Sequence, residues 1–228
     1  MDNSSNNSDS NRTVRNRLLE AAAESFAEKG FDGTSIRDIT AKANCNVAAV
    51  NYHFGGKENL YSEVFRRHMI AMRDTRITSI EKVMSQTDHE PTLEELLRAF
   101  ATAFIEPLID QSSGRRFMKL MVREMSDPHL PRKMFIEELA GPTLSALGKG
   151  MARVCPGLEQ EKILLSIISI VGQLVHAIHL NEIVDRGDLV GAPTPSLVEM
   201  VDHIVEFSAA GIRATVKEKN EETNRRNN

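Results

Sequence analysis

Apolar side chains recur along most of this chain at the three- and four-residue spacing of an amphipathic helix, and we find no strict alternation typical of a half-buried strand. Residues 13–29 carry one apolar stripe, made of Val14, Leu18, Ala22 and Phe26. Gly30 follows, where helices often end in a left-handed residue. The pattern therefore predicts a first helix from Thr13 to Lys29.

Three further helices are predicted over residues 36–43, 47–53 and 57–84. Asp38 is placed to complete a capping box with Ser35 at the start of the first of these, and Asn46 is the expected N-cap of the second. No helix-breaking residue interrupts the third, so it is expected to be a single long helix.

The rest of the chain is predicted to form longer helices, at about 93–110, 114–126, 131–154, 159–186 and 196–217. Thr92 and Glu95 form another capping box, and Pro107 and Pro142 are expected to kink or split their helices. Residues 1–11 and 217–228 are polar and poor in apolar groups, so we expect a disordered arm and a disordered tail. The predicted fold class is all-α.

Composition restricts the class of protein only loosely. In 228 residues, 41% are hydrophobic and 26% charged, as in ordinary globular proteins, and the net charge of −4 argues against a chain that is basic throughout. Cys45 and Cys155 have neither a disulfide framework nor metal-ligand spacing. Polar residues interrupt the longest apolar stretch, 163–180, and the N-terminus lacks the pattern of a signal peptide. We expect a cytoplasmic protein without a cofactor, a metal or a membrane span.

Residues 36–53 have the pattern of a helix-turn-helix. A first helix is followed by the turn Asn44-Cys45-Asn46 and a short second helix, and small or apolar residues stand where two such helices must cross: Ala43, Val47 and Val50. A short second helix can place its first turn in the major groove of DNA. The pattern therefore predicts a DNA-binding unit over residues 12–61, and the helical periodicity after it predicts a separate helical-bundle domain over 62–216.

Several polar side chains of this region can bond phosphates or base edges, namely Asn44, Asn46, Asn51, Tyr52 and His53. Two helix starts flank them, at Thr34-Ser35 and at Gly55-Gly56-Lys57, and a helix start favours phosphate. Thr34, Ser35 and Asn46 also suit simple helix capping, and Tyr52 and His53 alone would suit partly buried aromatic positions. The clustering of these residues is what favours DNA binding.

Three segments resemble the DNA-binding domain of the tetracycline-repressor (TetR) family: Phe31–Ile39, Ala43–Val47 and Val50–Tyr61. The resemblance covers roughly residues 12–61 and implies an obligate homodimer whose repression is relieved by a small-molecule effector. It assigns phosphate contacts to Thr34, Tyr52 and Lys57, and it places Asn46, Val47, Ala48, Ala49 and Asn51 on the recognition helix.

This sequence departs from the family pattern at two places. Asn51 stands where many members have an aromatic residue, and Val47-Ala48-Ala49 offers methyl groups, which suit thymine methyls, in place of long polar side chains. Residues 51–58, together with Arg123-Glu-Met-Ser-Asp-Pro128, are similar to the subgroup called CecR-like.

The resemblance implies an effector pocket in the second domain. Apolar side chains that could line it, with two polar ones that could contact an organic effector, are Phe100, Phe104, Phe117, Met118, Met121, Met125, Gln173 and His176. Methionine fills irregular gaps, but ordinary core packing explains these residues equally well.

The last two helices are apolar over much of their circumference, which predicts that each buries more than one face. One face would meet a second copy of the chain in a four-helix interface. The residues assigned to this interface are Ile167, Ile170, Val171, Leu174, Ile178, Leu197, Val201, Ile204 and Ser208. A fully buried core helix in a monomer is the alternative.

Three functions remain open from the sequence. The first is a repressor of a palindromic operator that is released by an effector; the second is a DNA-binding regulator without an effector, acting architecturally or as an activator. The third is a small helical enzyme using His176, His179 and Glu182, which no nucleophile–base pattern supports. The same three residues could hold a metal, but ordinary polar roles are the simpler explanation. The predicted partners are double-stranded DNA, a second copy and an unidentified small molecule, and no membrane.

Overall fold

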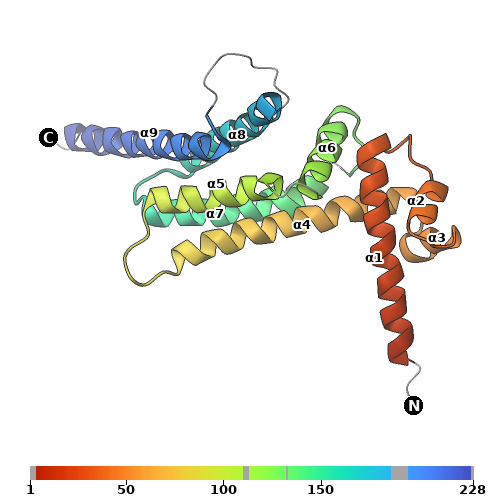
Figure 1. Cartoon of the computed structure of the whole chain (residues 1–228). Helices are drawn as coiled ribbons and strands as arrows, with labels where there is room; N and C mark the ends of the chain where they lie inside the picture. The colour runs from red at the N-terminus through yellow and green to blue at the C-terminus, as the bar shows by residue number, and fades with distance from the viewer. Residues whose placement is uncertain (1–3, 110–112, 132, 186–194, 227–228) are drawn as a thin grey trace. The chain divides into compact units, whose positions relative to one another are not determined.

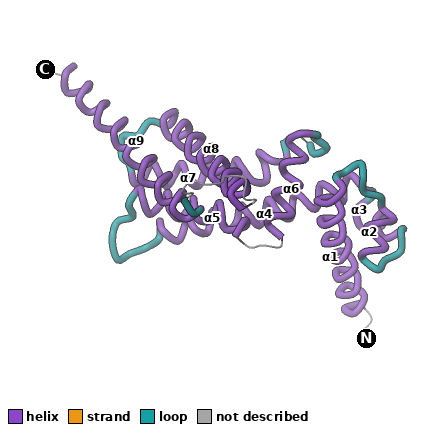
Figure 2. Tube along the Cα trace, turned by 45° about the horizontal axis from the view of Figure 1, so that its top comes forward, coloured by secondary structure: helices purple, strands orange, loops and turns teal. Residues whose placement is uncertain are grey.

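We describe a computed structural model of the chain, which covers residues 4–109, 113–131, 133–185 and 195–226. Every regular element in these residues is helical, which confirms the all-α class (Figures 1 and 2). In chain order the helices are α1 (Ser4–Lys29), α2 (Ile36–Lys42), α3 (Ala48–Phe54), α4 (Lys57–Met84), α5 (Leu93–Ile109), α6 (Ser113–Ser126), the π-helical turn η1 (Ile136–Ala140), α7 (Gly141–Val154), α8 (Gln160–Asp185) and α9 (Leu197–Arg226).

Two helices extend into segments for which we predicted disorder. Helix α1 begins at Ser4 rather than at Thr13, and α9 continues to Arg226 rather than ending near residue 217. Neither extension contains glycine or proline, and adding one residue to an existing helix needs no new nucleation. A polar composition therefore did not end either helix.

Pro107 and Pro142, which we expected to kink or split their helices, have different effects. Helix α5 continues through Pro107 to Ile109. The predicted helix over 131–154 is divided into η1 and α7, and Pro142 stands in the first turn of α7. Proline has no backbone N–H to donate to the preceding turn, and its ring crowds the carbonyl four residues back, which accounts for an irregular turn at this point.

The first compact unit comprises residues 1–71 and 108–138. Helix α1 packs against both α2 and α6, so the segment around α6 belongs with the predicted DNA-binding region rather than with the rest of the second domain. Leu18, Ala22 and Phe26 of the predicted stripe are fully buried, whereas Val14 is half-buried. Gly30 ends α1 with a φ of +76°, as predicted, and its N–H donates to the carbonyl of Phe26.

The second compact unit comprises residues 72–107 and 139–228. Helix α8 lies between α7 and α9 and packs against both. Capping boxes start α5, at Thr92 and Glu95, and α9, at Ser196 and Glu199. Arg98 with Asp202, and Arg213 with Glu94, connect α5 to α9 by ion pairs.

Most residues of the predicted dimer face pack inside the second unit. Val171 and Leu197 are half-buried, and the others are buried: Ile167, Ile170, Leu174, Ile178, Val201, Ile204 and Ser208. The sequence showed two apolar faces on each helix but did not show which one meets α7 or the neighbouring helix. The large apolar side chains left exposed on α8 and α9 are Leu164, Leu165, Ile168, Val175, Val198 and Phe207.

Helix α8 is also long and apolar enough to cross a membrane, since residues 160–181 include a window with a mean hydropathy of 2.0. This corrects our expectation that no segment would meet that criterion. Buried positions such as Ile167 and Leu174 alternate around this helix with exposed ones such as Ile168 and Val175. A core helix with a second apolar face meets the same criterion, so this finding is weak support for a membrane span.

Candidate nucleic-acid interface

Local bonds fix the geometry of the helix-turn-helix. The Ser35 hydroxyl accepts from the Asp38 N–H at 3.1 Å, and the Asp38 carboxylate accepts from the Ser35 N–H, which completes the predicted capping box. These bonds, with Lys29 nearby, lower the pKa of Asp38. Asn44 turns the chain with a φ of +51°, a conformation that asparagine tolerates better than most residues.

Asn46 starts the recognition helix α3. Its Oδ1 accepts from the Ala48 N–H at 2.9 Å, and its backbone carbonyl accepts from Ala49 at 2.9 Å. Val47, not Asn46 as predicted, is the N-cap of α3, which spans Ala48–Phe54 rather than 47–53, and Asn46 bonds the start of the helix from one residue earlier. Gly55 ends the helix with a φ of +77°, which a residue with a side chain adopts at a cost. A helix of only two turns is therefore closed at both ends by local bonds.

Helix α3 has one buried and one exposed face. Val50 and Phe54 are buried in the first unit and hold the helix in place. Seven of the predicted contact residues are exposed to solvent: Ser35, Asn44, Asn46, Val47, Ala48, Asn51 and Tyr52. Three more are partly exposed: Ala49, His53 and Lys57. This arrangement leaves amides, methyl groups and a phenol together on a rigid surface, as major-groove readout requires.

Tyr52 is the most exposed large side chain of this surface, at 77% of its full area. Its ring meets that of His53 edge to face, with 5.0 Å between the centroids. An exposed aromatic ring with a hydroxyl at its tip is suited to a phosphate or sugar contact.

Thr34 does not fit the role that the family resemblance assigned to it. Its side chain is only 1% exposed, and its hydroxyl lies 2.7 Å from the carbonyl oxygen of Gly30 and 3.0 Å from that of Ser25. The single hydroxyl proton is directed inward to these acceptors. Thr34 therefore joins the loop after α1 to α1 itself, and the structure removes its side chain from the candidate interface.

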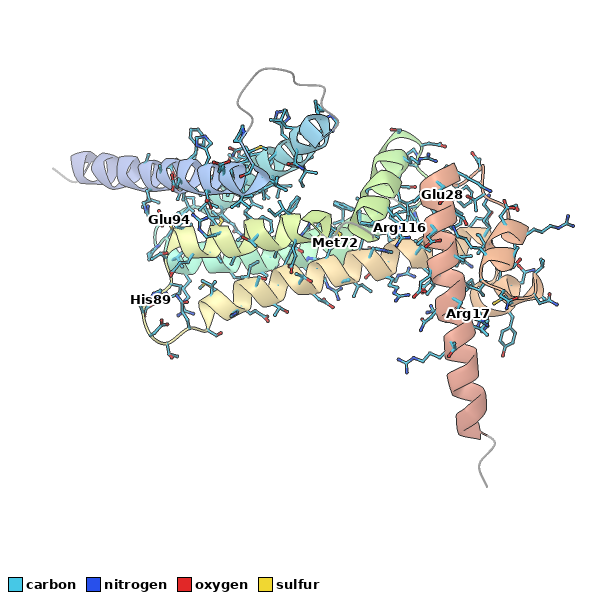
Figure 3. The ribbon with its side chains drawn as sticks, in the orientation of Figure 1. Arg17, Glu28, Met72, His89, Glu94 and Arg116 are labelled. Atoms are coloured by element: carbon cyan, nitrogen blue, oxygen red, sulfur yellow. The ribbon has the colours of Figure 1, made fainter. Side chains whose placement is uncertain are left out.

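The cations of the first unit divide into paired and unpaired groups. Lys42 pairs with Glu24 at 2.7 Å, which lowers the pKa of Glu24, and Arg15 pairs with Glu63 at 2.6 Å. In the part of the chain that the structure describes, no carboxylate pairs with Arg12, Arg17, Arg37 or Lys57. Figure 3 shows Arg17 on α1, where it is exposed. These unpaired cations are free to neutralise phosphates.

Lys57 is positioned by the face of an aromatic ring. Its Nζ lies 4.3 Å from the centroid of Phe31, in the loop between α1 and α2. The ring attracts the ammonium group without neutralising it, so the charge remains available at the first turn of α4. This placement agrees with the phosphate contact predicted for Lys57.

The segment after α6 supports this region through one carboxylate that the sequence did not single out. Glu124 accepts from the Tyr61 hydroxyl at 2.9 Å and from the N–H groups of His129 and Leu130 at 2.8 and 2.7 Å. Burial, and then the bond to Glu124, raise the pKa of the Tyr61 hydroxyl. The His129 ring in turn lies 4.4 Å from the Phe31 ring. Such long-range bonds leave no local signal in the sequence.

Helix α6 is joined to α1 by side chains of its exposed edge. Arg116 pairs with Glu24 at 2.7 Å, and Arg123 donates to the carbonyl of Glu28 at 3.0 Å. Figure 3 shows Arg116 and Glu28 where the two helices meet. The partners of these two arginines on α1 are a finding of the structure.

The predicted pocket residues are distributed over both compact units. Phe117 lies in the first unit, where its ring stacks on that of His68 at 4.6 Å, and Met121 there is partly exposed. Phe100 and Phe104 lie in the second unit, with centroids 5.8 Å apart. The side chains of Met118 and Met125 lie outside the described residues. The pocket remains a prediction.

The polar residues of α8 are placed at its surface. Gln173 donates to the carbonyl of Ser169 at 3.3 Å and lies 3.5 Å from the Ser208 hydroxyl, whereas His176 and His179 are exposed. The side chain of Glu182 lies outside the described residues. A different group, Asp32, Asp127 and His129, brings its possible ligand atoms within 4.8 Å of one another in the first unit. Both carboxylates of that group are exposed, which is common at surfaces without a metal.

Comparison with known proteins agrees with this geometry. The family described as "Bacterial regulatory proteins, tetR family" matches residues 18–64, and the C-terminal domain of the "HTH-type transcriptional dual regulator CecR" matches residues 93–212. The chain is 30% identical to CecR of Shigella flexneri over 150 residues, 61% of this chain and 63% of that protein. It is 29% identical to the HTH-type transcriptional regulator YttP of Bacillus subtilis over 118 residues, 50% of this chain and 51% of that protein.

The chain thus spans between half and two thirds of the length of these relatives. Among solved structures, a protein described as a TetR-family transcriptional regulator from Mesorhizobium loti superposes with a TM-score of 0.64 at 21% identity, covering 90% of this chain and 97% of that one. This likeness concerns the fold. Together the two matched domains, one of them covering more than half of the chain, show that the protein belongs to the TetR family of DNA-binding transcriptional regulators, in its CecR-like group.

Proposed function

We propose that this regulator is a homodimeric repressor that binds a two-fold symmetric operator in the cytoplasm and releases it when a small molecule binds to the second unit. The observation that carries the DNA-binding part is the exposed face of α3, held in place by Val50 and Phe54. Asn46 and Asn51 on this face would contact base edges, and Tyr52 a phosphate.

The dimer is supported by the apolar surface left uncovered on α8 and α9. Leu164 and Leu165 are 49% and 50% exposed, Ile168 is 57% exposed, and Phe207 on α9 is 65% exposed. Large apolar side chains grouped on neighbouring helices are typical of a surface that is covered by a partner. A second copy would cover its own equivalent surface in the same contact, as two-fold symmetry requires.

Release by an effector is supported by the continuity of α4. This single helix runs from Lys57, at the candidate DNA surface, to Met84 in the second unit. A ligand that prefers the conformation not bound to DNA would weaken operator binding by the ratio of its two affinities. Operator DNA must then weaken effector binding by the same factor, and an effector whose affinity ignores the operator would contradict the mechanism.

Repression is one of two outcomes open to the same DNA-binding surface. The relative from Shigella flexneri is described as a dual regulator, which favours activation as a second candidate. The position of the operator relative to the promoter would decide between the two. A DNA-binding protein without an effector remains the other alternative.

A genome-wide binding footprint, followed by titration of the recovered operator, tests the proposal. We expect a two-fold symmetric footprint, with half-sites separated by one or more helical turns of DNA, in steps of about 34 Å. The variant carrying Asn46→Ala and Tyr52→Ala should bind the operator at least about tenfold more weakly, whereas the control variant Lys133→Ala should bind normally. A single asymmetric half-site, or equal binding by all three proteins, would contradict the proposal.

A further inference from the structure

Arg76, in the second half of α4, is a buried cation without a counter-charge. Its residue is 5% exposed, and its Nε is buried with no hydrogen-bond partner. Within the described residues no carboxylate pairs with it, and its guanidinium lies over the ring of Phe104, 4.0 Å from the centroid. Burial lowers the pKa of Arg76 to about 10, so the group still carries its charge at neutral pH.

Three other arginines of the second unit show what Arg76 lacks. Arg98 pairs with Asp202, Arg213 pairs with Glu94, and Arg153 donates to the carbonyl of Met84 at 3.0 Å. All three are exposed, so their pairing stabilises little, yet each has an acceptor. A buried guanidinium needs an acceptor far more than an exposed one does.

Thr143, in the first turn of α7, carries the other buried polar side-chain atom that has no partner among the described residues. Helices α4 and α7 run in the same direction in Figure 1. A Cβ added at Gly150 would lie 3.6 Å from the sulfur of Met84, so these two positions are level with each other. Counting back seven residues on each helix places Thr143 level with residue 77, one residue from Arg76.

Aromatic and aliphatic side chains lie near Arg76. Phe104 covers one face of its guanidinium, and Phe100 meets Phe104 at 5.8 Å. Ile80, one turn further along α4, is buried as well. Both phenylalanines were predicted from the sequence to line an effector pocket. A ligand that reaches Arg76 must therefore combine one negative charge with an apolar body.

We propose that Arg76 and Thr143 form the anchor of a binding site for a small organic monocarboxylate, whose apolar body packs against Phe100 and Phe104. The carboxylate would accept hydrogen bonds from the guanidinium, through the Nε that now lacks an acceptor, and from the Thr143 hydroxyl. A single negative charge balances the single cation. A phosphate monoester, with nearly two charges, would leave an excess charge buried.

This inference names the chemical class of the effector and in that respect rests on the proposed function. It can be tested without DNA, on the full-length protein, by titrating benzoate and octanoate in a buffer free of other carboxylates. Benzamide and octanamide are the matched neutral probes. We expect both carboxylates to raise the melting temperature and to shift the Arg76 Nε–H resonance, and we expect neither amide to do so.

Two variants connect the effect to the proposed anchor. Arg76→Met keeps the length of the side chain and should abolish the shift in melting temperature, and Thr143→Val keeps the shape and should weaken carboxylate binding about tenfold. Without ligand, Arg76→Met should be at least as stable as the wild type, because the uncompensated buried charge is removed. If Arg76→Met does not fold, Arg76→Lys should still distinguish benzoate from benzamide.

The proposal is overturned if carboxylates and amides act alike on the wild type, or if Arg76→Met binds benzoate as the wild type does. Neither result would affect the proposed DNA binding, which is measured separately on the operator. Conversely, a protein that binds benzoate through Arg76 but recognises no operator would retain this site and lose the proposed function.

Discussion

Leu174 and Val175 are consecutive residues of α8, yet Leu174 is completely buried and Val175 is 52% exposed. One residue advances a helix by about 100°, which is enough to move a side chain from the α7–α9 packing to the opposite surface. Substitutions at the two positions therefore separate folding of the second unit from the proposed association with a second copy.

Leu174→Ala should destabilise the fold by about 2–5 kcal/mol, because it leaves a cavity among packed side chains. Val175→Asp should leave the folded monomer intact but prevent dimerisation, because it would bury an unpaired charge between the two copies. Urea unfolding and sedimentation equilibrium measure the two effects. A dimer that tolerates Val175→Asp as well as it tolerates Ala152→Asp, an exposed position on α7, would contradict the proposed interface.

Lys57→Met should weaken binding to every DNA sequence by a similar factor and reduce the salt slope by about one unit for each subunit. The reason is that the Lys57 ammonium is attracted by the Phe31 ring but has no carboxylate partner among the described residues. Lys42→Met is the matched control, since Lys42 already pairs with Glu24 at 2.7 Å. Titrations of each variant with operator DNA at several salt concentrations measure the dependence of affinity on salt. Equal salt slopes for Lys57→Met and Lys42→Met would show that Lys57 does not contact a phosphate.

Thr34→Val should lower the melting temperature while the folded protein keeps its affinity for the operator. The hydroxyl bonds inward to the Gly30 and Ser25 carbonyls, so its loss should cost about 1–3 kcal/mol of stability. Thermal unfolding and operator titration at low temperature provide the two readings. A large loss of affinity in a fully folded variant would instead restore the phosphate contact that the family resemblance assigns to Thr34.

His68 should make stability depend on pH near neutrality. Burial lowers the pKa of His68 from its ordinary value of 6.5, and the ring stacks on Phe117 with 4.6 Å between the centroids. The unfolded chain therefore binds a proton at a higher pH than the native protein, so the unfolding free energy should fall as the pH drops through and below 6.5. The difference between wild type and His68→Phe across pH 5–8 isolates this effect, and identical pH profiles would refute it.

Short-range sequence patterns were sufficient to predict the helix-turn-helix. The capping of α2 by Ser35 and Asp38, the role of Asn46 before α3 and the end of α1 at Gly30 each depend on residues within four positions of one another. Bonds over such short separations form in the same way wherever the segment lies in the protein.

Contacts between segments that are distant in the sequence decided which polar side chains are buried. Threonine is usually exposed, but the Thr34 hydroxyl bonds inward to the carbonyls of Ser25 and Gly30. Arg76 stands in the polar run Arg73-Asp-Thr-Arg76, and only the packing of the second unit buries it beside Phe104. The residues next to Thr34 and Arg76 in the sequence do not indicate that either side chain is buried.

The sequence by itself determined that the chain is helical and where the helices with capping boxes, α2 and α5, begin, because periodicity and capping are properties of neighbouring residues. It also determined that α8 and α9 each have two apolar faces. Only the tertiary structure decided that Leu174 faces inward and Val175 outward. Both residues are apolar, and the choice between them is made by the helices that α8 packs against.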